Sequence, residues 1–154
     1  MKVRSILTSL AVFLGAAALA LAADSNLGTW KLNEAKSKIG AGAPKPSTVV
    51  YSAVGDMVKV TVDGVDGEGK AVHSEWTGKY DGKDYAVTGD ANADMGWYKR
   101  VDANTVEFAR KKGGKVMTSG KVVVSADGKS RTVTIGGTNA KGEKFTATSY
   151  YDKQ

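Results

Sequence analysis

This chain of 154 residues contains no cysteine and only two prolines, Pro44 and Pro46. Without cysteine it can form no disulfide, and it has no thiol nucleophile. Both prolines precede Ser47, so every later segment keeps all of its backbone N–H donors. Because proline removes the donor that a sheet ladder needs, its absence leaves the whole region beyond Ser47 free to form strands.

Histidine is almost absent too, since His73 is the only one. One histidine cannot make a zinc site of the ordinary type, which needs three or four nitrogen or sulfur ligands. On an alternating strand Glu75 would share a face with His73, and a histidine beside a carboxylate is the minimum for general-base chemistry. No Gly-x-Ser-x-Gly motif accompanies the pair. We interpret the pair as an outward-facing cross-strand contact and predict that the protein is not an enzyme.

The chain has one long apolar run without a charge, from Ile6 to Leu21. Two basic residues precede this run, and the small-residue site Ala20-Leu21-Ala22 ends it, which is the layout of a cleaved secretory signal. We therefore predict a signal peptide at residues 1–22 and a protein that is exported, to the periplasm or outside the cell. The remaining residues, 23–154, are expected to form one domain. Its 20 basic and 16 acidic residues give a charge of +4, which permits contact with anionic surfaces without requiring it.

Beyond Ser47, turn signals rich in Gly, Asp and Asn recur every eight to thirteen residues or so, which is the rhythm of an antiparallel meander. Between them apolar and polar residues alternate, as in residues 57–62, where Val58, Val60 and Val62 would share one face. This pattern indicates about ten short strands, and only the segment NEAKSKI has helical composition, over too short a length to stand alone. Strands with one apolar face each must cover that face and their edges, and a closed barrel does both.

The sequence also contains an internal echo. Shifting the chain by 73 residues lays residues 50–70 on residues 123–143 without a gap, and valine, serine, threonine and glycine positions coincide. One interpretation is a duplicated block of strands; the other is that two hairpins share the same turn chemistry. The sequence leaves both open.

The segment GTWKL, Gly28 to Leu32, resembles the first strand of calycins, the lipocalins and fatty-acid-binding proteins, and ATSYYDK at residues 147–153 resembles the closing strand of the fatty-acid-binding group. Most of the chain after residue 22 also resembles small exported bacterial proteins of a lipocalin-like kind. The resemblance implies an all-β, antiparallel up-and-down barrel of about 8–10 strands. It further implies that Gly28 lets the backbone pass close to a neighbour and that Trp30 is a structural plug at the barrel floor.

Two departures limit what this resemblance implies. The fatty-acid-binding group holds a ligand carboxylate with an arginine and a tyrosine two residues apart in the last strand; Tyr151 matches the tyrosine, but Ser149 stands in place of the arginine. That group also inserts two lid helices between its first two strands, whereas only residues 33–46 are available here. Any pocket should therefore be more open, or be filled with side chains.

The leading hypothesis is a non-catalytic protein that binds a small, largely apolar molecule inside the barrel, with no cofactor. Large side chains that could line a pocket are the first candidates, because aromatic walls hold apolar ligands. Arg100 and Tyr151 are the candidates for a polar contact. The predicted ligand-binding residues are Tyr51, Trp76, Trp97, Arg100, Phe108, Met117 and Tyr151.

A calcium loop is the best metal candidate, because Asp90, Asn92 and Asp94 occupy its first, third and fifth places. Met95 stands where the loop needs glycine, and Val101 stands where it needs glutamate. We therefore predict that these side chains form turns and that no metal site exists.

The alternative hypothesis is a packed barrel without a cavity that acts as a cell-envelope interaction module. Four basic residues surround Gly113-Gly114, which is typical of a hairpin tip that could contact an anionic surface: Arg110, Lys111, Lys112 and Lys115. No stacking signature accompanies them, so specific nucleic-acid binding is not expected, and we expect a monomer. An integral outer-membrane barrel is disfavoured, because lysines interrupt the strands that would need an apolar band.

Overall fold

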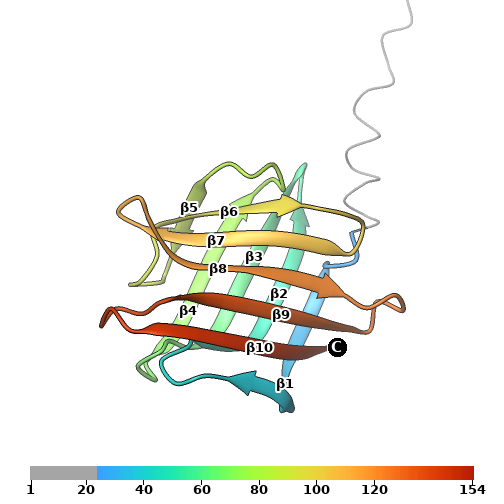
Figure 1. The fold of residues 1–154 in the computed structure, drawn as a ribbon. Helices are drawn as coiled ribbons and strands as arrows, with labels where there is room; N and C mark the ends of the chain where they lie inside the picture. The colour runs from blue at the N-terminus through green and yellow to red at the C-terminus, as the bar shows by residue number, and fades with distance from the viewer. Residues whose placement is uncertain (1–23) are drawn as a thin grey trace, which may run out of the picture.

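Ten antiparallel strands close into one barrel in the computed structural model, which describes residues 24–154 (Figure 1). Each strand pairs with its neighbours in sequence, and β1 pairs with β10, which confirms the predicted closed up-and-down barrel. The predicted signal peptide, residues 1–22, lies outside the described residues. The strands are β1 (Gly28–Ile39), β2 (Lys45–Val54), β3 (Met57–Val65), β4 (Ala71–Gly78), β5 (Tyr85–Thr88), β6 (Met95–Arg100), β7 (Thr105–Lys112), β8 (Lys115–Val124), β9 (Ser130–Thr138) and β10 (Lys144–Lys153).

The first and last strands close the barrel. Trp30 lies opposite Lys153 and Leu32 opposite Tyr151, so the C-terminal end of β10 lies beside the start of β1 (Figure 1). On its other side β1 pairs with β2, where Trp30 lies opposite Val49. Closure gives each strand a neighbour on both sides, although the β1–β2 ladder covers only Gly28–Lys31 and leaves the rest of β1 unpaired with β2.

The segment NEAKSKI does not form a helix but the second half of β1. Between Asn33 and Lys38 the pairing with β10 shifts, so the intervening residues bulge out of the ladder. The Asn33 carboxamide accepts the N–H of Lys36, and the Ser37 hydroxyl accepts the N–H of Tyr150. Side chains with turn chemistry thus replace the missing ladder bonds. In residues 24–154 no helix is long and apolar enough to cross a membrane.

The core follows the alternation in the sequence. Val58 and Val60 on β3 and Trp76 on β4 are each 1% exposed, and their neighbours Lys59 and Glu75 form an ion pair at 2.8 Å on the outer face. Most buried side chains form one cluster around Trp30, Trp76 and the valines. The alternation predicted from the sequence therefore places the core correctly.

The 73-residue echo corresponds to two hairpins of the same geometry. β3 shifted by 73 residues has the bounds of β9, and in both hairpins a glycine near the strand end packs against a bulged partner strand, Gly64 against β2 and Gly137 against β8. In the loops that follow, the Asp66 and Asn139 side chains each accept backbone N–H bonds from residues two and four positions later. The match therefore extends from turn chemistry to strand bounds, and it does not decide between the two interpretations.

Candidate ligand-binding cavity

A cavity of about 160 Å³ lies inside the barrel. Valines, Ile135, Phe108 and Phe145 make up much of its wall. Residues from the β1–β2, β3–β4, β5–β6 and β9–β10 loops, which lie at one end of an up-and-down barrel, also line it. We call this the open end. The β1–β2 connection there is the short stretch 40–44, with no lid helices, as the sequence indicated.

Trp30 lies within the core at the opposite end, which we call the closed end. Its side chain is 0% exposed, and its indole N–H donates to the carbonyl of Asn26 at 2.8 Å. Two residues earlier, Gly28 has a φ of 122°, a conformation that side chains rarely adopt. The atom nearest to an added Cβ at Gly28 is the Cε of Lys153, a flexible side chain. The need for glycine therefore comes from the backbone conformation, whereas the sequence had suggested a close backbone approach.

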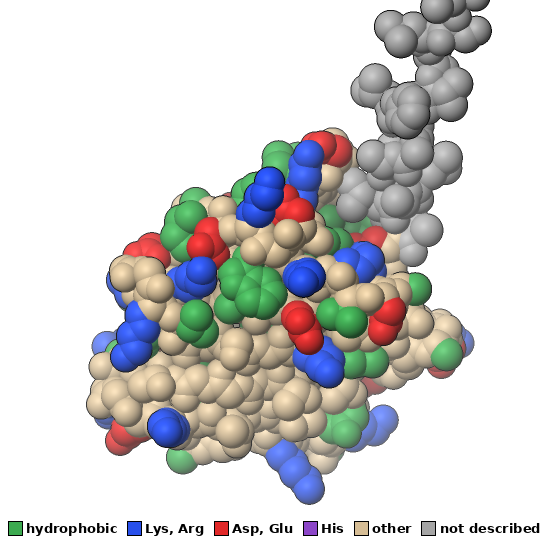
Figure 2. All heavy atoms as spheres, turned by 45° about the horizontal axis from the view of Figure 1, so that its top comes forward, with side chains coloured by type: hydrophobic (Ala, Val, Ile, Leu, Met, Phe, Trp, Pro, Cys, Tyr) green, Lys and Arg blue, Asp and Glu red, His purple; other side chains and the backbone are tan. Residues whose placement is uncertain are grey.

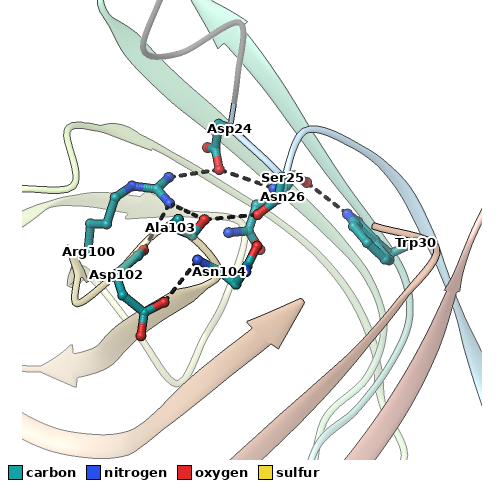
Figure 3. Close-up of polar contacts among 8 residues, drawn as sticks. All are labelled: Asp24, Ser25, Asn26, Trp30, Arg100, Asp102, Ala103 and Asn104. Atoms are coloured by element: carbon teal, nitrogen blue, oxygen red, sulfur yellow. Dashed lines mark hydrogen bonds and ion pairs between the residues drawn. The ribbon is translucent and has the colours of Figure 1, made fainter. Parts of the chain in front are cut away.

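Arg100 belongs to the closed end. Its guanidinium contacts the carboxylate of Asp24 at 2.7 Å and the carbonyl of Ala103 at 3.3 Å (Figure 3). The Asp24 side chain is fully buried; the same Oδ1 atom also accepts the N–H of Asn26 at 3.1 Å, and Oδ2 has no hydrogen-bond partner. Arg100 therefore ties the residues just before β1 to the β6–β7 loop. Arg100, predicted as a polar ligand contact, does not line this cavity, because its side chain lies at the end away from it.

The cavity wall includes four of the seven predicted ligand-binding residues. Tyr51, Phe108, Met117 and Tyr151 line it. The Tyr151 hydroxyl donates to the carbonyl of Pro46 at 2.8 Å. The fatty-acid-binding resemblance therefore locates this tyrosine in a pocket wall, and the structure gives its hydroxyl a backbone partner.

Two tryptophans that the sequence analysis predicted to bind the ligand do not line the cavity. Trp76 is inward-facing and buried, but its ring packs 4.5 Å from that of Tyr98, which itself forms the wall. Trp97 lies opposite Ala109 and is only half-buried, since its neighbours Gly96 and Tyr98 occupy the inner face. The alternation of the strand places Trp97 on the outer face. Trp97 was chosen as a wall residue for its size, without regard to this alternation.

Two arginines that the sequence analysis missed line the cavity. Arg131 lies on the inner face of β9 with Val133 and Ile135, and Arg110 lies on the inner face of β7 with Phe108. The signal was present, because the alternation that places Val133 and Phe108 inside also places residues 131 and 110 inside. The two arginines were not chosen as wall residues because arginine is rarely buried without a partner.

The inner tyrosines stay protonated near neutral pH. Burial raises the pKa of the Tyr151 hydroxyl to about 12, although the Arg131 cation opposes the rise. Burial also raises the pKa of Tyr51 and Tyr80. These hydroxyls can therefore make hydrogen bonds, but they supply no general base at neutral pH.

His73 and Glu75 lie on the outer face, 4.0 Å apart between the His73 Nε2 and the Glu75 carboxylate, and each has a closer partner. The His73 Nδ1 contacts the carboxylate of Asp63 across the β3–β4 pair, while Glu75 pairs with Lys59. A hydrogen bond to Asp63, and then its negative charge, raise the pKa of His73 above the ordinary value of 6.5.

We therefore expect an NMR titration of His73 to give a pKa above 6.5, and Asp63→Asn to bring it back toward 6.5. A raised folded-state pKa stabilises the fold fully below 6.5 and loses that contribution as pH rises through the folded-state pKa. The group is exposed, so the change in stability should be small. An unchanged His73 titration in Asp63→Asn would contradict the assignment of Asp63 as the cause.

The candidate calcium loop forms a turn. Asp90 accepts the N–H of Asn92 at 2.8 Å, and Asp94 accepts the N–H of Gly113 at 3.0 Å. Within residues 24–154 no three His, Asp or Glu side chains gather closely enough to hold a metal ion.

The basic tip at Gly113-Gly114 is smaller than the sequence indicated. Arg110 points into the barrel, where it donates to the Tyr98 hydroxyl at 2.8 Å, and Lys111 pairs with Asp84 at 2.7 Å. Lys112 and Lys115 are exposed. On the face that Figure 2 shows, basic side chains lie singly among acidic ones. The proposed cluster of four is therefore wrong for Arg110, because residue 110 falls on the inner face of β7.

The structure is a closed ten-strand antiparallel barrel with an internal cavity. No model of a protein family and no curated protein sequence matches the chain. Among solved structures the chain is similar to EF1p2_mFAP2b bound to DFHBI, with a TM-score of 0.52 and 9% identity over 88% of this chain and 98% of the other. A redesigned beta barrel, mFAP1, bound to DFHBI has a TM-score of 0.48 and 12% identity over 86% and 98%. At these identities the likeness shows the fold alone.

Proposed function

We propose that this protein binds one small, largely apolar molecule inside its barrel and does no covalent chemistry on it. The cavity, open at one end and backed by packed side chains at the other, is the observation that carries the proposal. An apolar cavity of roughly 150 Å³ in another protein accommodates a benzene-sized molecule, so a volume of about 160 Å³ suits a ligand of that order, with room to extend through the open end.

Two further observations support the proposal. The similar barrel EF1p2_mFAP2b has DFHBI bound, so this fold can hold a small molecule. The apolar run before Ala22 is the basis for proposing an exported, lipocalin-like binding protein that acts in the periplasm or outside the cell. The alternative, a packed barrel that acts through basic loops, requires a filled interior, and the cavity counts against it.

Native mass spectrometry of the purified protein, followed by solvent extraction of whatever co-purifies, tests this function directly. We expect an adduct of small mass that extraction removes. We also expect members of a panel of fatty acids, retinoids and bile salts to change the emission of Trp30 and Trp76, which pack against wall residues Arg131 and Tyr98. The titration uses the Trp97→Phe variant, because this substitution removes the fluorescence of the outward-facing tryptophan. A protein that is always empty, with emission that ignores every compound, would contradict ligand binding.

Filling the cavity should weaken binding strongly without unfolding the barrel. Val133→Phe adds a ring to a half-buried wall position on β9, and the empty volume beside it gives the ring a place to go. We expect at least a tenfold loss of affinity, measured by the same emission titration. Thr134→Phe is the matched control, because residue 134 is the exposed next position on the same strand. Equal losses in both variants would show that the ligand does not occupy this cavity.

A further inference from the structure

Arg131 carries a positive charge inside the barrel without a counter-charge. Its side chain is 2% exposed, and its guanidinium carbon lies 4.8 Å from the ring centre of Trp30 and 4.9 Å from those of Tyr51 and Tyr151. The buried Nε and Nη1 atoms donate to no acceptor. Among the ion pairs of residues 24–154, none includes Arg131.

Arg110 adds a second cation to the same cavity wall. One of its nitrogens donates to the Tyr98 hydroxyl, and its Nη1 is buried without a partner. The third inward arginine, Arg100, differs because it has the Asp24 carboxylate at 2.7 Å. The arginine at the closed end therefore has a carboxylate partner, whereas the two that face the cavity have none.

Two carboxylates at the open end also line the cavity, but other groups already engage them. Glu68 lies 3.1 Å from the ammonium of Lys70 and 3.9 Å from that of Lys141. Asp90 accepts a backbone N–H in its own loop. Neither forms an ion pair with the arginines inside, so the two inner guanidinium groups have no carboxylate in contact with them.

An apolar side chain occupies the corresponding inner position in the other hairpin. Val58 occupies the equivalent place on β3 in the 73-residue echo, and it is 1% exposed. A buried charge without a partner is costly, and aromatic rings offset only part of that cost. A buried group that is costly for the fold and that lines a cavity without a counter-charge is typical of a binding residue.

We propose that the ligand carries an anionic group of the carboxylate type, which Arg131 binds deep in the cavity while the apolar part of the ligand extends toward the open end. This inference rests on the proposed function. Arginine suits the position better than lysine would, because a flat guanidinium stacks on rings with its faces and donates hydrogen bonds from its edge.

Octanoate and octanamide, which differ in charge but little in shape, test the inference at pH 7 by emission titration and calorimetry. We expect the unmodified protein to bind octanoate at least about tenfold more tightly than octanamide. In Arg131→Met we expect this preference to disappear while octanamide still binds. Lys121→Met is the matched control, since it removes one positive charge from an exposed outward position, and it should keep the preference.

The possible outcomes separate the two proposals. Equal binding of both probes by the unmodified protein, or a preference that survives in Arg131→Met, would overturn the role of Arg131 and leave the binding function intact. Binding of neither probe, nor of the wider panel, would overturn both. Should Arg131→Met fail to fold, Ser149→Asp replaces it, because residue 149 lies diagonally across from Arg131 on the inner face of β10. The new carboxylate should pair with Arg131 and abolish the octanoate preference, and a preference that persists would overturn the inference.

Discussion

Trp30→Ala is expected to lower the free energy of unfolding by about 3–5 kcal/mol, the usual range for removing a buried aromatic side chain. Trp30 is 0% exposed, and burying an indole removes on the order of 200 Å² from water. The substitution also leaves the Asn26 carbonyl without the indole N–H and takes away one of the three rings that surround Arg131. Few single changes in this chain should cost as much.

Urea unfolding followed by far-UV circular dichroism measures the loss. Trp97→Ala is the matched control, because it removes the same side chain from a half-buried outward position on β6. We expect its cost to be well under half that of Trp30→Ala. Equal costs for the two variants would mean that Trp30 does not seal the closed end in solution.

Gly137→Ala is expected to destabilise the barrel by about 1–3 kcal/mol, the range for forcing an extra group into a packed site. A Cβ at residue 137 would meet the carbonyl oxygen of Met117 and the Cα of Thr118, which are backbone atoms that cannot swing away. Met117 falls at the bulge where the β7–β8 register shifts, and its side chain lines the cavity. The substitution should therefore also weaken ligand binding.

Gly136→Ala provides the neighbouring control for this prediction. A Cβ there would have no atom nearer than 3.8 Å, so the change should alter stability by no more than about 1 kcal/mol, in the direction of a gain. Thermal unfolding of the two variants side by side makes the comparison. If Gly137→Ala proved as stable as Gly136→Ala, the close approach of β9 to the bulge in β8 would be wrong.

Most of the fold could be predicted from the periodicity of the sequence. Alternation in residues 57–62 placed Val58 and Val60 inside, and the spacing of turn signals predicted about ten strands, which the structure confirms. Such local signals suffice because a strand's two faces are set by its own residues. The same rule would have excluded Trp97 from the wall, so that error was one of application.

The site was less predictable than the fold. Of the residues predicted to bind a ligand, Tyr51, Phe108, Met117 and Tyr151 line the cavity, whereas Arg100 lies at the opposite end of the barrel. The alternation of residues along a strand indicates whether a side chain faces inward, but it does not indicate how far along the barrel axis that side chain lies. That depth follows from the register of all ten strands together.

By itself the sequence determined the strand class, the inner and outer faces and the closing pair of strands, because each depends on patterns a few residues long or on the two ends of the chain. Only the tertiary structure decided that the interior keeps a cavity, that Asp24 neutralises Arg100, and that Arg131 remains unpaired among Trp30, Tyr51 and Tyr151. These features bring together residues from strands far apart in the chain, and no local pattern encodes which of them meet.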